Sequence, residues 1–182
     1  MASDQERNQV IVADILCTCK EGRKIIVLTE RTDHLDMLRA LLAEEIDDLH
    51  VLHGRMSKKQ RAITIAHLES LPDDVPRVLL ATGKLIGEGF DYPPLDTLVL
   101  AMPISWKGTL QQYAGRLHRE HAAKLDVRIY DYVDAAHPAL MRMWVKRQRG
   151  YRAMGYRICE QNDNQDSDNP NGRPNARPTG RR

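Results

Sequence analysis

Aromatic residues are scarce in this sequence, and Phe90 is the only phenylalanine among its 182 residues. The hydrophobic core must therefore consist mainly of Leu, Ile, Val and Ala. This length suffices for one domain with a substantial core but not for two. No apolar run approaches the length of a membrane span or of a signal-peptide core, which predicts a soluble, cytoplasmic protein without a membrane partner.

Net charge and cysteine content are also low. A formal net charge of +2 is far from that of a strongly cationic nucleic-acid binder. Cys17, Cys19 and Cys159 are too few for a disulfide framework, and no further ligands stand at zinc spacing, so we expect reduced, buried thiols. His118 and His121 lack the carboxylate of an H-E-x-x-H motif, and no metal site is predicted.

Short apolar runs of strand length alternate with segments of helical periodicity. The predicted strands are residues 24–29, 49–53, 77–81, 97–101 and 127–133. Uninterrupted runs such as KIIVLT are typical of strands buried on both faces of a parallel sheet. Residues 5–20 and 138–156 are predicted helices. A third helix follows the N-cap Thr32, with Leu35, Leu38, Leu41 and Leu42 as its apolar stripe. Two more helices open with capping boxes at Ser57 and at Thr109.

The alternation of strands and helices defines the expected domain organisation. It implies right-handed crossovers and a parallel sheet of about five or six strands, which is a single α/β domain. We expect this domain to span residues 21–158, after an N-terminal helical extension at residues 1–20. Residues 159–182 are polar with almost nothing apolar, and they should form a disordered tail.

Polar residues follow three of the predicted strands. Thr29 ends the first and Arg31 lies just beyond it, His53 ends the second, and Thr82 and Gly83 come directly after the third. Ligands of parallel α/β sheets gather at the carboxyl ends of the strands, where free N–H groups suit a row of phosphates. A single threonine there is more often a helix cap, but the repetition favours phosphate contact.

The segment Gly87-Glu-Gly-Phe-Asp-Tyr-Pro-Pro94 combines glycines with a carboxylate. Gly87 and Gly89 allow tight backbone turns. Asp91 could accept hydrogen bonds from a ribose or fix arginines opposite. A lone G-x-G is weak evidence, and an ordinary crossover between strands is the alternative.

A further segment, Gln112-Tyr-Ala-Gly-Arg-Leu-His-Arg119, reads Q-x-x-G-R-x-x-R. At helical spacing Gln112, Arg116 and Arg119 share one face. Gly115 beside them would let another backbone come close. Two guanidiniums are costly to bring together unless a polyanion such as a triphosphate lies between them. The alternative is a solvated face with a chance glycine.

Basic residues cluster towards the C-terminal end. Residues 142–157 include six of them and no acid: Arg142, Lys146, Arg147, Arg149, Arg152 and Arg157. Such a stretch is either a solvated helix face or a nucleic-acid contact. We expect Trp144 and Tyr151 to anchor this helix rather than to stack on bases.

In this order, the segments resemble the motifs of the second RecA-like domain of superfamily 2 helicases and translocases. Residues 24–31 look like motif IV, and Leu52-His-Gly-Arg-Met56 looks like the segment that follows it. Leu79-Leu-Ala-Thr82 with Gly87-Glu-Gly-Phe-Asp91 resembles motif V. Residues 112–119 resemble motif VI.

The resemblance covers residues 24–134 and looks strongest to the motor subunits of restriction enzymes and their DNA-repair relatives. The glutamine that opens motif VI differs from the histidine of the DEAD-box RNA branch. The resemblance implies a RecA-like (P-loop NTPase type) parallel sheet with helices on both faces. It also implies ATP as cofactor and nucleic acid as partner, DNA rather than RNA.

The resemblance assigns a role to each matching residue. Arg116 and Arg119 would be arginine fingers on the γ-phosphate of ATP, which in comparable systems raise turnover by about 10³ to 10⁵. The residues implied at the nucleotide are Gln112, Gly115, Gly89 and Asp91. The residues implied at nucleic-acid phosphates are Thr82, Gly83, Thr29, Arg31 and His53.

The other half of such a motor is missing from this sequence. No G-x-x-x-x-G-K-[ST] phosphate loop occurs, and no apolar strand ends in Asp-Glu to hold Mg²⁺. The sequence therefore predicts a C-terminal motor domain that needs an N-terminal helicase domain, in cis or in trans, to hold ATP and Mg²⁺. The alternatives are a stand-alone nucleic-acid-binding or regulatory module without motor activity, and an unrelated phosphate-binding α/β enzyme.

The isolated chain should hydrolyse no ATP, with or without DNA. Arginine fingers stabilise charge on a phosphate that another group must already hold, and this chain has no phosphate loop. A phosphate-release assay at high protein concentration measures the activity. DNA-stimulated turnover that persists through rigorous purification would contradict the half-motor interpretation.

Overall fold

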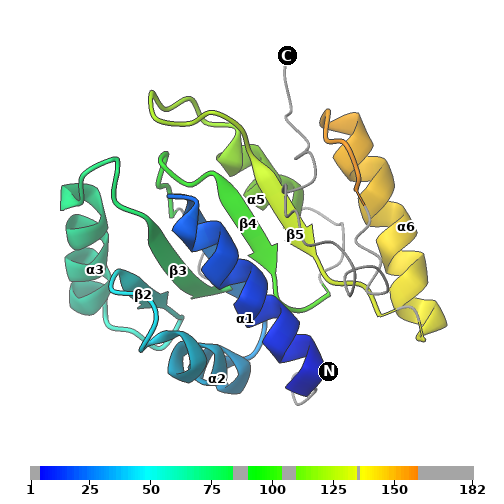
Figure 1. The fold of residues 1–182 in the computed structure, drawn as a ribbon, viewed down its shortest axis with the longest axis horizontal. Coiled ribbons are helices and arrows are strands. Elements are labelled where there is room, and N and C mark those ends of the chain that lie inside the picture. The colour runs from blue at the N-terminus through cyan, green and yellow to red at the C-terminus, as the bar shows by residue number, and fades with distance from the viewer. Residues whose placement is uncertain (1–4, 84–89, 104–109, 135, 160–182) are drawn as a thin grey trace, which may run out of the picture.

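The computed structural model describes residues 5–83, 90–103, 110–134 and 136–159. Five strands form one sheet in the order β2-β3-β1-β4-β5, and every adjacent pair is parallel (Figure 1). The strands are β1 (Lys24–Thr29), β2 (Leu49–Leu52), β3 (Arg77–Thr82), β4 (Thr97–Leu100) and β5 (Arg128–Asp131). The predicted parallel α/β fold is confirmed, with strand ends within two residues of those expected.

Strands β1 and β3 form the centre of the sheet. Both are buried at every position, and they pair in register from Lys24 with Arg77 to Thr29 with Thr82. A strand with apolar side chains on both faces must be covered on both faces. The register also sets Thr29 beside Thr82 at the carboxyl edge of the sheet.

Helices α1 (Gln5–Lys20) and α2 (Thr32–Leu42) cover one face, with α1 in front of the sheet in Figure 1. Ile11 and Ile15 of α1 are fully buried against this face. Burying an isoleucine side chain stabilises a fold by about 1.5–3 kcal/mol. The segment expected as an N-terminal extension is therefore packed into the core.

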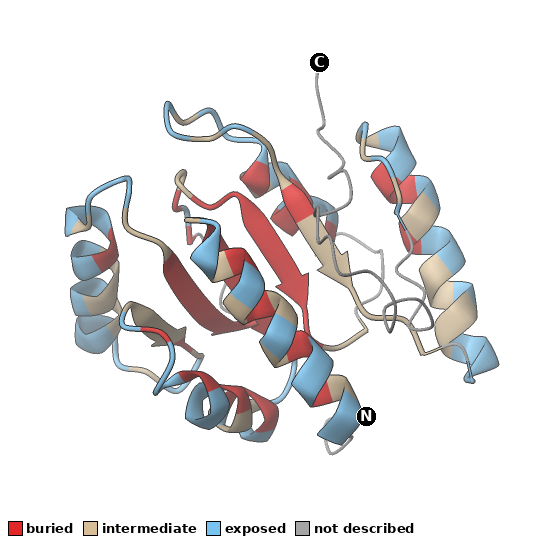
Figure 2. Cartoon of the chain, in the orientation of Figure 1, coloured by how far each residue is buried: buried red, intermediate tan, exposed pale blue. Residues whose placement is uncertain are grey.

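The opposite face is covered by α3 (Lys58–Ser70), α5 (Gln111–Leu117) and α6 (Pro138–Ala153). The helical residues buried in this second core are Leu68, Tyr113, Leu117 and Tyr151. Figure 2 shows the buried central strands between helices whose outer sides are exposed. Helices thus lie on both faces of the sheet, as the resemblance implied.

Of the helix caps predicted from the sequence, the one at Ser57 is confirmed and the one at Thr32 is wrong. In α3 the Ser57 Oγ accepts from the Gln60 backbone N at 3.2 Å, and the Gln60 Oε1 accepts from the Ser57 N at 3.1 Å, the expected capping box. In α2 the extended cap residue is Arg31, so Thr32 is already helical and does not cap. Thr109 lies outside the described residues.

The expected burial of the thiols was wrong. Cys17 and Cys159 are exposed and Cys19 is half-buried. Ile11, Ile15 and Thr18 form the stripe of α1 that faces the sheet, which turns Cys17 towards solvent. Similarly, Leu41 of α2 is 49% exposed, outside the buried stripe of its helix.

The sequence also predicted that no membrane span exists and that the C-terminal tail is disordered. Within the described ranges, no helix is both long and apolar enough to cross a membrane. The expected tail lies, from residue 160 onward, outside the described residues.

A buried ion pair attaches α6 to β5. The Arg147 guanidinium donates to both carboxylate oxygens of Asp131, at 2.6 and 2.9 Å, and the Tyr151 hydroxyl donates to Asp131 Oδ2 at 2.9 Å. The Arg147 side chain is 1% exposed and that of Asp131 is 5% exposed. Burial, and then the Asp131 charge, raise the pKa of Tyr151, so its hydroxyl remains a donor.

Asp131→Ala should destabilise the protein by about 3–5 kcal/mol, because it leaves the Arg147 charge buried without its carboxylate. Urea denaturation followed by circular dichroism measures the free energy of unfolding. Asp33→Ala is the matched control, since it removes an ion pair with Arg31 whose side chains are 57% and 63% exposed. A loss at Asp131 no larger than that at Asp33 would contradict this account of α6 docking.

Candidate nucleotide and nucleic-acid site

Helix α5 is fastened to the segments that follow β3. The Tyr113 hydroxyl donates to the carbonyl of Gly83, and the Arg116 Nη1 donates to the carbonyl of Phe90. The buried stripe of the helix comprises Leu110, Tyr113, Ala114 and Leu117. This stripe determines which side of α5 turns outward.

Gly83 is closely surrounded at the end of β3. A Cβ at this position would lie 2.6 Å from Oε1 of Glu30 and 3.2 Å from the Tyr113 hydroxyl. Burial, and then the Glu30 charge, raise the pKa of Tyr113 to about 12, so the phenol donates its hydrogen bond throughout the neutral range. Glu30 also places negative charge beside the predicted phosphate contacts.

Arg116 and Arg119 bind consecutive residues of one segment. Arg116 is half-buried against the Phe90 carbonyl, and Arg119 Nη1 lies 2.7 Å from Asp91 Oδ2. The Arg119 and Asp91 side chains are 57% and 40% exposed. An ion pair this exposed contributes at most about 1 kcal/mol, so another anion can replace the carboxylate at small cost. Of the two roles considered for Asp91, the structure shows the contact with an arginine.

Helix α5 is too short to carry Gln112, Arg116 and Arg119 on one continuous face. It ends at Leu117, and Arg119 belongs to the following turn, with its N donating to the Arg116 carbonyl at 3.2 Å. The expected i, i+4, i+7 face is therefore wrong for Arg119. Lys124 stabilises this end of the helix, because its Nζ donates to the carbonyls of Leu117 at 2.8 Å and Arg119 at 2.7 Å.

Gln112 and Gly115 lie on the outward side of α5 and are exposed. Apart from its chain neighbours and the backbone of α5 itself, no described atom lies within 4 Å of a Cβ built at Gly115. The expected close approach of another backbone is therefore absent from the described part of the chain, since the buried stripe turns Gly115 away from the sheet. Gly89 lies outside the described residues.

At the end of β1, Thr29 serves an internal network. Its side chain is almost fully buried, its hydroxyl lies 3.1 Å from Nδ1 of His34, and it accepts from the Arg31 N at 3.3 Å. The His34 Nε2 in turn lies 3.0 Å from Asn8 Oδ1 on α1. Burial lowers the pKa of His34, which favours the neutral ring.

The remaining predicted phosphate contacts differ in accessibility. Thr82 is 8% exposed, next to the buried Gly83. The Arg31 guanidinium is exposed and pairs with Asp33. His53 is half-buried, and its Nδ1 accepts from the Arg55 N at 3.2 Å. Among the predicted phosphate contacts, the side chains of Arg31 and His53 are therefore the more accessible.

Three residues of this site were not expected from the sequence: Glu30, Tyr113 and Lys124. Tyr113 could have been found, because Leu110, Tyr113 and Leu117 repeat at helical spacing. Lys124 could also have been found, as a basic side chain just beyond a helix C-terminus. Glu30 has no sequence signal, since its proximity to Gly83 depends on the pairing of β1 with β3.

A parallel five-stranded sheet with helices on both faces and arginines near its carboxyl edge defines a RecA-like α/β domain. Residues 7–121 match the family described as "Helicase conserved C-terminal domain". The chain belongs to this family, which confirms the predicted C-terminal domain of superfamily 2 helicases. The restriction and DNA-repair branch stays a prediction.

Sequence relatives come from viruses and a phage. Uncharacterized protein 108L of Invertebrate iridescent virus 3 is 33% identical over 107 residues, which are 59% of this chain and 98% of 108L. Transcript termination protein A18 of Fowlpox virus (strain NVSL) is 27% identical over 75% of this chain. Probable helicase D10 of Escherichia phage T5 is 23% identical over 73% of this chain. The matched region spans only 29% of A18 and 30% of D10.

Two solved structures share the fold. T4 UvsW superposes with a TM-score of 0.65 at 18% identity, over 84% of this chain and 33% of UvsW. The C-terminal part of the Fun30 ATPase domain superposes with a TM-score of 0.61 at 19% identity, over 72% of this chain and 43% of that structure. The chain thus corresponds to less than half of each solved relative.

Proposed function

We propose that this chain is the C-terminal RecA-like half of an ATP-dependent DNA helicase or translocase. In this proposal Arg116 and Arg119 are arginine fingers for an ATP molecule held against a separate phosphate-loop domain. That domain, in cis or in trans, binds Mg²⁺ and the triphosphate. The family supports the helicase assignment, and the missing phosphate loop supports the need for a partner domain.

The observation that carries the proposal is the convergence of the two guanidiniums. Arg116, from α5, and Arg119, from the turn after it, both bind the segment Phe90–Asp91. Arg116 is the more rigid, since a backbone carbonyl holds it, whereas Arg119 can exchange an exposed carboxylate for a phosphate. Charge that develops on a transferring γ-phosphate is stabilised by donors already held in position.

The outward side of α5 supplies the rest of the proposed nucleotide surface. Gln112 and Gly115 face solvent there, where a partner domain could bring the nucleotide against them. In the proposal Gln112 binds the nucleotide, and Asp91 and Gly89 line the cleft. Asp91 also neutralises Arg119 while no phosphate is bound.

The proposed nucleic-acid contacts lie at the ends of β1, β2 and β3. Arg31 and His53 reach the phosphates with their side chains, and Thr82 and Gly83 contribute through the end of β3. Thr29 supports this edge through His34 and the Arg31 N. The glutamine that opens the α5 motif favours DNA over RNA in this proposal.

One relative favours a second candidate function. Protein 108L is matched over 98% of its length, so nearly all of it corresponds to this chain, which has no phosphate loop. We infer as the alternative a stand-alone nucleic-acid-binding or regulatory module. The two functions differ in whether a phosphate-loop domain restores hydrolysis.

When a phosphate-loop domain is supplied in cis or in trans, Arg119→Ala should lower kcat for ATP hydrolysis at least about 100-fold with little change in KM. The reason is that the Arg119 guanidinium contacts the γ-phosphate mainly in the transition state. Arg119→Lys should rescue poorly, since an ammonium lacks the planar fork. Steady-state ATPase kinetics measure both. Arg39→Ala, an exposed arginine of α2 on the other face of the sheet, is the control. If Arg119→Ala instead abolished DNA binding and left ATP hydrolysis intact, Arg119 would be a contact with the phosphate backbone of DNA.

The isolated chain should bind DNA weakly and without sequence preference. About three or four phosphate contacts predict a slope near −3 for log K against log salt, and a dissociation constant of about 10⁻⁴ to 10⁻⁶ M. Thr82→Ala should weaken binding by about 1 kcal/mol. Fluorescence anisotropy over a salt series, with duplex DNA and RNA of one sequence, measures this. Salt-independent binding would contradict the phosphate row, and tighter binding to RNA would contradict the choice of DNA.

A further inference from the structure

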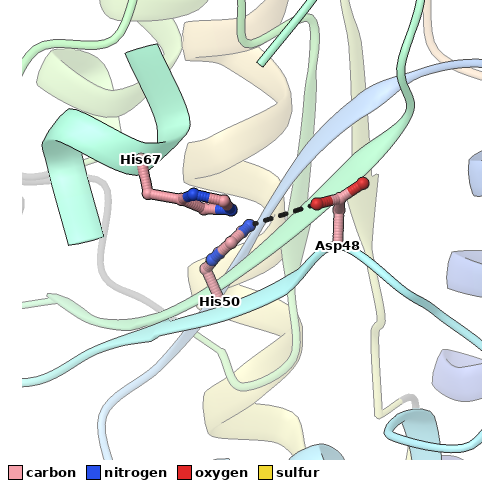
Figure 3. A group of neighbouring side chains, drawn as sticks. All are labelled: Asp48, His50 and His67. Atoms are coloured by element: carbon pink, nitrogen blue, oxygen red, sulfur yellow. Dashed lines mark ion pairs between the residues drawn. The ribbon is translucent and has the colours of Figure 1, made fainter. Parts of the chain in front are cut away.

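Asp48, His50 and His67 form a cluster at the opposite end of the strands from the α5 arginines. Asp48 directly precedes β2, His50 lies on β2, and His67 lies near the end of α3. One ligand atom from each residue can be chosen so that all three lie within 4.8 Å of one another. Figure 3 shows the three side chains directed towards one another from the strand and the helix. Within the described ranges, no other set of three His, Cys, Asp or Glu residues meets this criterion.

The nitrogen of His50 that faces the cluster is not satisfied by hydrogen bonding. The His50 Nε2 lies 3.9 Å from Asp48 Oδ1, beyond hydrogen-bond distance, and the His50 side chain is 13% exposed. This atom is buried and has no hydrogen-bond partner among the described residues. The His67 ring lies opposite, with ring centroids 5.1 Å apart. A buried polar nitrogen left in this way needs an explanation, and a bound cation is one.

We propose that Asp48, His50 and His67 bind a Zn²⁺ ion, with water as the fourth ligand. Zinc bonds of about 2.0–2.2 Å in a tetrahedron set neighbouring ligand atoms about 3.4 Å apart. The ligand atoms lie within 4.8 Å of one another and His50 Nε2 lies 3.9 Å from Asp48 Oδ1, so the cluster has to close by up to about 1.4 Å, through rotation of both the exposed His67 side chain and the Asp48 carboxylate. Two imidazoles and one carboxylate suit zinc, whereas Mg²⁺ and Ca²⁺ prefer oxygen ligands throughout.

The charges around the cluster restrict which ion it binds. Asp48 supplies one negative charge, and the positive charge of Arg77 lies near His50. The Arg77 guanidinium itself is held by carbonyls at the end of α3, including that of Leu68 at 3.0 Å. Attraction by charge alone is therefore weak here, and binding depends on coordinate bonds from the imidazoles. This again favours a transition metal over Mg²⁺ or Ca²⁺.

A metal at this position joins α3 to the edge strand β2. The proposed nucleotide and nucleic-acid contacts lie at the carboxyl ends of the strands, whereas Asp48 and His50 lie where β2 begins. Zinc should therefore raise stability without changing nucleic-acid binding. The sequence predicted no metal site, because these ligands stand on different elements without a recognised spacing.

The test uses the full chain without an affinity tag, freed of metal by a chelator and titrated with ZnCl₂. Calorimetry should give one zinc ion per chain, and the melting temperature should rise by about 5–10 °C at a hundredfold excess over Kd. His67→Ala should weaken zinc binding more than about 100-fold, since loss of an outer hydrogen-bond partner alone costs up to that much. This variant should fold, because His67 is exposed on α3 and alanine favours helix.

His137→Ala is the matched control. His137 is an exposed histidine whose Nε2 lies 3.7 Å from Asp134 Oδ2, and it belongs to no such cluster in the described ranges. It should bind zinc as the natural sequence does. Co²⁺ should give a visible spectrum without thiolate-to-cobalt charge transfer, which excludes the cysteines as ligands. Equal zinc affinity in His67→Ala, no zinc-dependent stabilisation, or a thiolate band would each overturn the proposal.

Discussion

Burial of β1 and β3 on both faces is the constraint on which the rest of this structure depends. Each strand carries apolar side chains on both sides, so helices must pack on both faces of the sheet. Covering one face with α1 and α2 and the other with α3, α5 and α6 satisfies this requirement. The parallel pairing then brings the carboxyl ends of β1 and β3 together, where the polar residues that follow each strand meet.

Packing of α5 on this sheet also orients the proposed active residues. Tyr113 and Leu117 are buried, and the Tyr113 hydroxyl binds the Gly83 carbonyl. Arg116 is therefore held at the margin of the core, while Arg119 lies in the turn that Lys124 stabilises. One guanidinium is fixed and the other is free to exchange partners, an arrangement suited to a site completed by a second domain.

The two ends of the strands carry different kinds of polar chemistry. At the amino ends, ion pairs of largely buried arginines connect several elements: Arg23, just before β1, binds Asp96 and Asp126, and Arg128 of β5 binds Glu21, which follows α1. These ion pairs stabilise the start of β1, β4 and β5. At the carboxyl ends, Arg31, His53 and Arg119 remain accessible to an anion.

The sequence by itself determined the α/β class, the five strands and the capping box at Ser57, because each depends on periodicity or spacing along the chain. The helicase motifs were found through their resemblance to a known family, and the family match confirms them. The end of α5 before Arg119, the outward position of Gly115 and the internal hydrogen bonds of Thr29 were decided only by tertiary structure. So were the proximity of Glu30 to Gly83 and the cluster of Asp48, His50 and His67. Such contacts join residues on different elements, and which of them meet depends on strand register and helix packing.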